Sequence, residues 1–374
     1  EAPVVRLVND MFNRAVELGA SDIHVEPGES EMKIRFRVDG VLHTAMNPPQ
    51  SYYAAIASRL KLIANMNIAE RRLPQDGRID YSAGRDQLDV RVSTVPSVYG
   101  ESIVLRLLQK DISIYNLENL GLPKGVRKTL EDLVHRPYGM LIVVGPTGSG
   151  KTTTLYSVMQ LLNSDSRKII TIEDPVEYQL PGLTQIQVRP QIGLAFANGL
   201  RSIVRQDPDV ILVGEIRDRE TAEIAIHAAL TGHMVFSTLH TNDAAGAISR
   251  LLEMGIEGFL ISSALLGVLS QRLVRTYCSQ CGGKGAIAND GQEKRCRNCG
   301  GTGYKGRTGI FELLQADDAI RHAINTHQDS TEIARLACRA GMRLLQEDGM
   351  DKVTEGTTSR AEVARVCQAD PTEA

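Results

Sequence analysis

The spacing of apolar side chains changes near residue 109. Before this point, segments with helical spacing alternate with segments in which every second residue is apolar. Helices are predicted from Val4 to the glycine at position 19 and over 52–63, strands over 32–38, 41–42, 86–95 and 102–108, and a hairpin turn at Asp39-Gly40. Residues 1–108 are therefore expected to form an α+β domain.

Residues 109–122 are charged and contain asparagine and glycine, which is typical of a linker. Beyond them, short β-branched runs alternate with helical stretches, the pattern of a parallel sheet with crossover helices. Buried strands are predicted at 140–144, 168–172, 210–213 and 234–238. The fold class is therefore α/β, with a second domain over residues 123–374.

Three further segments belong to this second domain. Residues 259–269 form the longest apolar candidate, and their serines and glycine favour a buried helix. Residues 278–309 are a Gly-rich insertion with four cysteines, and residues 312–374 have the spacing of a helical tail. No apolar run approaches the ~18 residues of a membrane span.

Composition narrows the possible functions. The chain has 42 Lys and Arg against 45 Asp and Glu, a net charge of -3, whereas nucleic-acid-binding proteins are more often basic. Aromatic residues make up 4% and tryptophan is absent, which disfavours a stacking platform for single strands. The chain starts at Glu1 without an initiator methionine, which suggests a processed or truncated chain, and no signal peptide follows, so nothing in the sequence points to secretion.

One segment carries a nucleotide-binding motif. Residues 145–152 match G-x-x-x-x-G-K-[ST] between a predicted strand and a predicted helix, the context that separates a P-loop from a chance Gly-rich turn. Its backbone N–H groups can converge on phosphate oxygens at a helix N-terminus. Lys151 is expected to meet the β- and γ-phosphates and Thr152 to ligate Mg²⁺. The predicted ATP-binding residues are Gly145, Pro146, Thr147, Gly148, Ser149, Gly150, Lys151, Thr152 and Thr153.

Three polar residues follow other strands of the same predicted sheet. Glu173, Glu215 and His240 each come after the C-terminal end of a strand, the edge where open α/β sheets bind ligands. A single acid there is usually a solvated loop residue or a helix cap, but three such positions beside a P-loop favour catalysis. His233 precedes its strand and suits a structural hydrogen bond equally well.

The six cysteines divide into four and two. The spacing of the first four, in two CxxC pairs, is typical of a tetrahedral zinc site, formed by Cys278, Cys281, Cys296 and Cys299. Two disulfides or a redox pair are the alternatives, and the absence of a signal peptide disfavours disulfides. Four protein ligands leave no open position, so the zinc is expected to be structural. Cys338 and Cys367 lie in helical patterns and are expected to be buried.

Three arginines of the first domain are candidates for an anionic partner. Arg91 lies on the polar face of an alternating strand, which by itself favours a solvated side chain. Arg106 interrupts an apolar strand, where an arginine is seldom found without an anion. Arg78 sits beside a predicted turn.

Together these motifs resemble the secretion ATPase superfamily, which drives type II secretion, type IV pili and related machines. The resemblance covers nearly all 374 residues and rests on the P-loop, the cysteine insertion and the segments 73–78, 171–178, 205–209, 213–218, 231–243 and 306–309. Residues 242–245 and 266–273 are most similar to the type II secretion branch, and the type IV pilus extension ATPases are the runner-up.

The resemblance implies a RecA-like P-loop core preceded by a PAS-like domain. It implies a cytoplasmic homo-hexamer, peripherally associated with the inner membrane, that acts on platform proteins through a further N-terminal domain missing here. ATP with Mg²⁺ would bind between the two domains, and its hydrolysis would drive pseudopilus assembly and protein export across the outer membrane.

The resemblance also assigns roles to the candidate residues. Glu173 and Glu215 would share the handling of the metal's waters and the attacking water, and His240 would contact the γ-phosphate. Arg91 and Arg106 would reach the nucleotide as the domains close.

Two functions of other classes stay open. A DNA translocase or helicase can use the same RecA-like core, although the acidic net charge disfavours it. A nucleotide-dependent scaffold with little turnover is the second, although the full set of candidate catalytic residues disfavours it.

Overall fold

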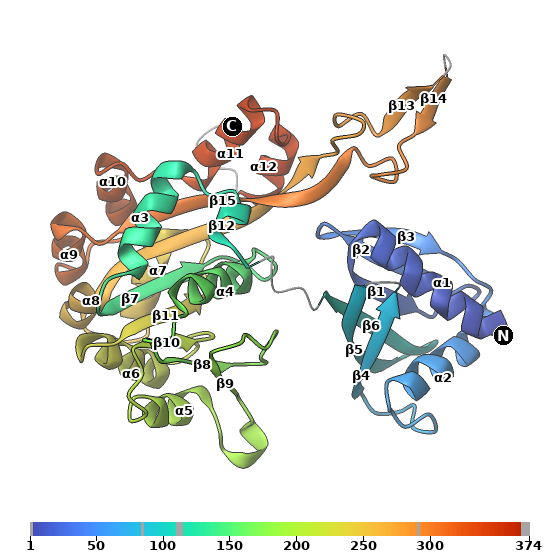
Figure 1. Cartoon of the computed structure of the whole chain (residues 1–374), viewed down its shortest axis with the longest axis horizontal. Coiled ribbons are helices and arrows are strands. Elements are labelled where there is room, and N and C mark those ends of the chain that lie inside the picture. The colour runs from blue at the N-terminus through green and yellow to red at the C-terminus, as the bar shows by residue number, and fades with distance from the viewer. Residues whose placement is uncertain (1–2, 84–85, 110–114, 290–291, 368–374) are drawn as a thin grey trace. The chain divides into compact units, whose positions relative to one another are not determined.

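The computed structural model describes residues 3–83, 86–109, 115–289 and 292–367 (Figure 1). The chain divides into two compact units, residues 1–111 with 277–306 and residues 112–276 with 307–374. Residues 110–114 of the predicted linker, and the end of the predicted tail from 368, lie outside the described residues. The domain boundaries drawn from the sequence therefore stay a prediction.

Unit 1 is built on a six-stranded antiparallel sheet in the order β3-β2-β1-β6-β5-β4. Two helices cover one face, α1 (Pro3–Leu18) and α2 (Tyr53–Ile63) (Figure 1). The strands are β1 (Ala20–Glu26), β2 (Lys33–Val38), β3 (Val41–Met46), β4 (Gln75–Ala83), β5 (Asp86–Ser97) and β6 (Gly100–Gln109). Alternate residues of the central strands, such as Phe36, Val90 and Leu105, are buried in the core that these helices cover.

The predicted helices and the strands β2, β5 and β6 of this unit are confirmed. The sequence analysis missed β1 and β4. Strand β4 lies at the edge of the sheet and buries only Ile79 among the described residues, so its sequence carries little apolar alternation. Its place comes from nine-residue pairing with β5 rather than from local pattern.

Unit 2 is built on a seven-stranded sheet in the order β15-β12-β7-β11-β10-β8-β9, parallel from β12 to β9. The strands are β7 (Gly139–Val144), β8 (Ile169–Glu173), β9 (Thr184–Gln187), β10 (Val210–Val213), β11 (Met234–Leu239), β12 (Leu265–Tyr277) and β15 (Tyr304–Gln315). The four predicted buried strands correspond to β7, β8, β10 and β11, and the RecA-like α/β class is confirmed.

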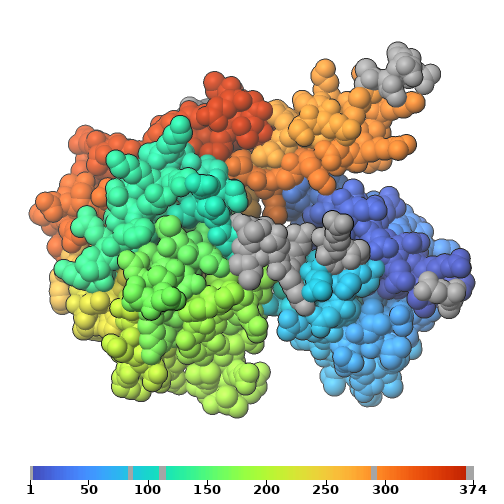
Figure 2. Space-filling model, viewed as in Figure 1, coloured from blue at the N-terminus to red at the C-terminus, as the bar shows by residue number. Residues whose placement is uncertain are grey.

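Helices cover both faces of this sheet. One face packs on α3 (Lys124–Val134) and α4 (Lys151–Leu162). The other packs on α5 (Phe196–Ile203), α6 (Arg219–Leu230), α7 (Ala244–Glu253), α8 (Gly258–Ala264), α9 (Asp318–Asn325) and α10 (Ser330–Arg339). The chain continues through α11 (Leu345–Thr354) and α12 (Arg360–Val366), and Figure 2 shows α3 and the C-terminal helices forming one surface of unit 2.

Two segment predictions in this unit are wrong in part. The buried helix expected over 259–269 ends with α8 at Ala264, and Leu265 already begins β12. A short apolar run buried on all sides has no clear periodicity, so its sequence does not separate strand from helix. Likewise the helical tail expected from Glu312 begins at Asp318, because residues up to Gln315 complete β15.

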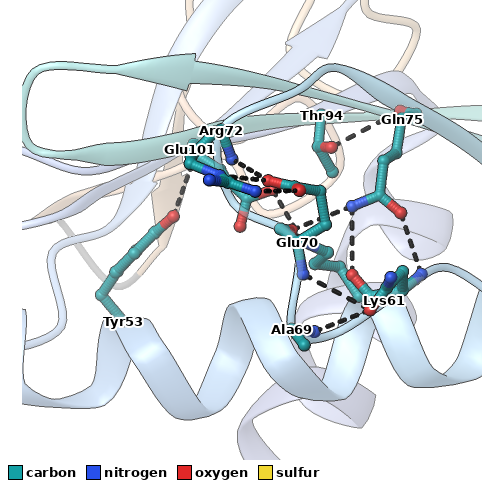
Figure 3. A network of polar contacts seen from close by, with 9 residues as sticks. Tyr53, Lys61, Ala69, Glu70, Arg72, Gln75, Thr94 and Glu101 are labelled. Carbon is teal, nitrogen blue, oxygen red and sulfur yellow. Dashed lines mark hydrogen bonds and ion pairs between the residues drawn. The ribbon is translucent and has the colours of Figure 1, made fainter.

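A buried ion pair joins α2 to β6 in unit 1. The Nζ atom of Lys61 donates to Glu101 Oε1 at 2.8 Å, and both side chains are at most 5% exposed. Lys61 Nζ also donates to the Glu70 carbonyl, and Tyr53 donates its hydroxyl to the Glu101 carbonyl at 2.7 Å (Figure 3). The Gln75 amide donates to the same Glu70 carbonyl. This network ties the segment between α2 and β4 to the sheet.

We expect Glu101→Gln to lower the free energy of unfolding by about 3 kcal/mol, because it leaves the buried ammonium of Lys61 without its counter-charge. Hydrogen exchange along α2 and β6 in the full chain measures this loss. The control is Glu31→Gln, since Glu31 pairs with Lys33 at 4.0 Å on the surface and its loss should cost under about 1 kcal/mol. Equal protection in the two variants would contradict the account.

Candidate active site

The P-loop lies at the carboxyl end of β7, where the strand passes into α4. Gly145, Gly148 and Gly150 have φ angles of 147°, 79° and 92°, in the region that favours glycine. At Gly145 a Cβ atom would lie 2.7 Å from the Gln271 carbonyl oxygen, so a side chain would disrupt the loop. All nine predicted ATP-binding residues, 145–153, lie in this loop and the first turn of α4. The N-terminus of α4 therefore points its free N–H groups at a loop that can surround an anion.

Lys151 bends back over the loop that precedes it. Its Nζ donates to the carbonyls of Gly145 at 2.7 Å and Pro146 at 3.1 Å. Burial lowers the pKa of Lys151 to about 8, an effect that the negative charge of Glu215 opposes and the positive charge of Arg272 strengthens. A partly desolvated ammonium beside free N–H groups is a receptor for phosphate oxygens.

Glu215 lies two residues beyond β10, at the same edge of the sheet. Its side chain is 14% exposed and forms an ion pair with Arg217, while His240 Nε2 lies 3.5 Å from its Oε2. Its charge acts on Lys151. The structure thus brings together three of the predicted catalytic residues, Lys151, Glu215 and His240.

Glu173 has a different environment at the end of β8. Its carboxylate is buried and accepts from the Tyr156 hydroxyl, from Thr171 Oγ1 at 2.5 Å and from Gln185 Nε2 at 3.2 Å. Burial, followed by the charge of Glu173, raises the pKa of Tyr156, which also accepts from the Glu177 backbone N–H at 3.3 Å. Hydrogen-bond donors from α4, β8 and β9 therefore fix the Glu173 carboxylate at this edge of the sheet.

The two candidate histidines have different surroundings. His240 follows β11 and is 53% exposed beside Glu215, where a ligand can reach it. His233 has its Nδ1 2.8 Å from the Ala228 carbonyl at the end of α6, which is a structural contact. Of its two sequence interpretations, the structure favours the structural one.

Two residues that lie beside the P-loop, Gln271 and Arg272, were not predicted from the sequence. Gln271 donates to the Ser149 carbonyl at 2.8 Å, and Arg272 donates to the Asn242 carbonyl at 2.7 Å. They lie at the carboxyl end of the sheet on β12. The same rule that selected Glu173 and Glu215 would have selected them if residues 265–270 had been predicted as a strand.

In unit 1 the three candidate arginines form one row across the sheet. Strand register places Arg78 opposite Arg91, Arg91 opposite Arg106, and Arg106 opposite Asp22, so these side chains share the face away from the helices. Arg106 is 59% exposed and its Nε donates to Asp22 Oδ1 at 3.1 Å; Arg78 pairs with Asp89. The anionic partner expected for Arg106 is therefore Asp22, on a strand buried on one face only.

The four cysteines of the insertion converge on one point. All are buried, and their Sγ atoms lie within 4.8 Å of one another. The Sγ atoms of Cys278 and Cys296 are 3.9 Å apart and those of Cys281 and Cys299 3.7 Å, close to the ~3.8 Å that a tetrahedron with Zn–S bonds of about 2.3 Å requires. The N–H groups of Gly285 and Gly303 donate to two of these sulfurs. The insertion also contains the hairpin β13 (Ala286–Asn289) and β14 (Gln292–Arg295), and the cluster fits a four-thiolate metal site.

The other two cysteines correct a prediction. Cys338 is exposed and Cys367 is only partly buried, so neither is a core residue. Helix α10 buries Ile333 and Ala337, and Cys338, one residue further, turns about 100° away from that face.

Comparison with known proteins finds relatives with one kind of description. Residues 1–365 match the family model described as Type II/IV secretion system protein. Type II secretion system protein E of Dickeya dadantii is 50% identical over 98% of this chain and 76% of its own length. Type II secretion system ATPase E of Vibrio cholerae is 48% identical over 98% of this chain and 76% of its own.

Solved structures share the fold. The pilus retraction motor PilT with bound ADP has a TM-score of 0.65 at 27% identity, covering 98% of each chain. The Legionella pneumophila ATPase DotB has a TM-score of 0.71 at 24% identity, covering 96% of this chain and 95% of its own. In the part of the chain that the structure describes, no helix is both long and apolar enough to cross a membrane.

Proposed function

The chain belongs to the type II/IV secretion system protein family, and on that premise we propose that it is the ATPase of a type II secretion system, hydrolysing ATP with Mg²⁺ to drive protein export. The observation that carries this function is identity along nearly the whole chain to relatives named type II secretion system protein E. These relatives favour type II secretion over pilus extension, and a net charge of -3 disfavours a DNA translocase.

Steady-state release of phosphate from Mg·ATP by the purified chain tests this proposal. Release no greater than that of the Lys151→Ala variant would refute it. Export by a strain that depends on this chain as its only type II secretion ATPase tests the transport step.

The P-loop residues are proposed to bind the phosphates. Backbone N–H groups of residues 145–153 would surround the phosphate oxygens, and Lys151 would exchange its two carbonyl partners for the β- and γ-phosphates. The hydroxyl of Thr152 and the carboxylate of Glu215 are hard oxygen donors that suit Mg²⁺ and its waters. When bound, this ion neutralises charge on the phosphates.

Glu215 and Glu173 are proposed to have unequal roles. Glu215 is reachable from the P-loop and its carboxylate can orient a water for attack on the γ-phosphate. The Glu173 carboxylate already accepts hydrogen bonds from three side chains, so its proposed role is to position the end of β8 and the residues that follow it. His240, beside Glu215, would donate to a phosphate oxygen and respond to loss of the γ-phosphate.

Arg91 and Arg106 are proposed to neutralise the charge that spreads over the transferred phosphoryl group. Their support is the register that places them on one sheet face, together with the exposure of Arg106. Arg78 is a third candidate in the same row. Guanidinium groups suit this role because they offer several donors in a plane.

The assembly is also part of the proposal. Family membership supports a homo-hexamer that works on inner-membrane platform proteins from the cytoplasmic side. Light scattering of the chain with and without nucleotide measures the ring, and co-purification from membranes identifies the platform.

Above about pH 8, we expect Lys151 to take up a proton when nucleotide binds. Free Lys151 has a pKa of about 8, and bound phosphates would stabilise its ammonium and raise that pKa. Affinity for ADP should therefore fall as the pH rises above about 8 and change little through Lys151 below it.

Calorimetry in buffers of different ionisation enthalpy, near neutral pH and at about pH 9, measures this uptake. Lys151→Arg is the control, because arginine stays protonated and should remove the uptake at about pH 9. Equal proton uptake at both pH values in the unaltered chain would contradict the interpretation.

The cysteine cluster is proposed to hold one structural Zn²⁺. Elemental analysis should find about one zinc per chain, because four thiolates complete a tetrahedral site. Cys296→Ser should lose most of the metal and loosen the insertion, whereas Cys338→Ser, which alters an exposed cysteine of α10, should keep it. A metal-free chain with two disulfides would overturn the proposal.

A further inference from the structure

The middle of β12 lies beside the P-loop. Ser270 pairs with Val144, the last residue of β7, so the next two residues pass the point where the loop begins. These two residues are Gln271 and Arg272, which are 2% and 7% exposed. Burial of a polar side chain costs free energy unless the side chain is hydrogen-bonded, so the partners of these two residues explain why they are buried.

Gln271 fastens the P-loop to its own helix. Its Nε2 donates to the Ser149 carbonyl at 2.8 Å, and its Oε1 accepts from Thr154 Oγ1 at 2.7 Å. Its carbonyl oxygen occupies the space where a Cβ on Gly145 would lie. Gln271 is therefore a neutral support with both ends of its amide satisfied.

Arg272 joins β12 to the loop that follows His240. Its Nη1 donates to the Gln271 carbonyl at 2.9 Å, beside Gly145, and its Nη2 donates to the Asn242 carbonyl at 2.7 Å. Asn242 lies two residues after His240, in the loop that leads into α7. Among the described residues no carboxylate lies within 4.0 Å of this guanidinium, so a buried cation is held by carbonyl groups alone.

We propose that Arg272 is a positioning residue of the ATPase site, which fixes the 240–243 loop against the part of β12 that supports the P-loop and supplies a buried positive charge beside Gly145, next to the bound polyphosphate. The inference rests on the proposed function. Gln271 bonds the P-loop and Arg272 bonds the 240–243 loop from the same strand, so a shift of the P-loop on nucleotide binding would reach the segment that carries His240 through these two residues. A polyanion in the loop supplies the counter-charge that the protein leaves out.

The charges around this guanidinium are few and identifiable. Glu312 on β15, Asp243 at the start of α7 and Cys367 after α12 act on Arg272, and burial lowers its pKa. Glu312 is itself occupied by the backbone N–H groups of Ala244 and Leu345. On the P-loop side Arg272 acts on Lys151, which also faces Glu215.

Two substitutions separate the charge of Arg272 from its geometry. Arg272→Gln removes the charge, so kcat should fall roughly 10- to 100-fold and the dissociation constant for ADP should rise roughly 10-fold. Arg272→Lys keeps the charge but cannot span both carbonyls, so kcat should fall while the affinity for ADP stays close to that of the unaltered chain. Phosphate release and calorimetry with ADP measure the two quantities.

Arg275→Gln is the matched control. Arg275 lies on the same strand and pairs with Glu362 at 2.6 Å, so its loss should lower the melting temperature without changing kcat or the affinity for ADP. An Arg272→Gln variant that behaves like this control would overturn the inference. If Arg272→Gln does not fold, Arg272→Lys decides, and full kcat in that variant would overturn the positioning role.

The failure of this inference can be told from failure of the proposed function. If the unaltered chain releases no phosphate, the ATPase proposal fails, and the ADP affinities of the two Arg272 variants still test the charge of Arg272. If the unaltered chain hydrolyses ATP and both Arg272 variants match it, only the inference fails.

Discussion

Replacing Lys151 with alanine will reduce ATP hydrolysis to the background rate and leave the fold of unit 2 unchanged. The Nζ of Lys151 bonds only carbonyl groups of the loop, so its loss breaks no ion pair of the core. It does remove the side-chain cation that would meet the β- and γ-phosphates, for which we expect a loss of at least ~10³-fold in kcat.

Phosphate release at saturating Mg·ATP, with circular dichroism to verify folding, measures this effect. Lys168→Ala is the matched control, because Lys168 precedes β8 at the opposite edge of the same sheet and contacts the Gln206 carbonyl. The control should retain turnover. A Lys151→Ala protein that turns over ATP like the control would show that the P-loop is not the site of hydrolysis.

Replacing Arg106 with alanine will lower kcat by ~10³-fold or more with a smaller effect on nucleotide affinity. A guanidinium that acts on the transferred phosphoryl group contributes mainly in the transition state, where charge spreads over the phosphoryl oxygens. Arg106 is suited to this because its side chain is 59% exposed and Asp22 engages only part of its donors.

Arg35→Ala provides the comparison for Arg106. Arg35 lies on β2 of the same sheet and pairs with Glu26 at 2.6 Å, so its removal should change kcat little. Both variants should be assayed in their assembled form, with their oligomeric state measured beside the rate. Near-wild-type kcat for Arg106→Ala at saturating ATP would exclude its proposed role, and Arg91→Ala then tests the neighbouring residue of the row.

The nucleotide loop and the cysteine cluster could be predicted almost completely from the sequence, because both depend on residues close together in the chain. Three glycines and one lysine within residues 145–151 determine the loop, and two CxxC pairs determine the cluster. Such local spacing holds wherever the rest of the chain lies. The strands that follow the rule of buried β-branched runs, such as β10, were predicted for the same reason.

What the sequence could not supply depends on distant pairing. The row of Arg78, Arg91 and Arg106 exists only through the register of three strands, and Asp22 joins it from a strand that was missed. Arg272 was not predicted because residues 265–269, the start of its strand, were assigned to a helix.

Nor could spacing reveal the different surroundings of the two acids. Glu173 and Glu215 occupy equivalent places after their strands, yet Tyr156 and Gln185 enclose only Glu173.

The most direct test of the central claim is phosphate release by the unaltered, assembled chain with ATP, with and without Mg²⁺. The account predicts turnover that requires Mg²⁺, disappears in Lys151→Ala and is unchanged by added double-stranded DNA. Turnover that persists in Lys151→Ala would contradict the P-loop as its site. Strong stimulation by DNA would contradict the assignment to protein secretion and support a DNA motor.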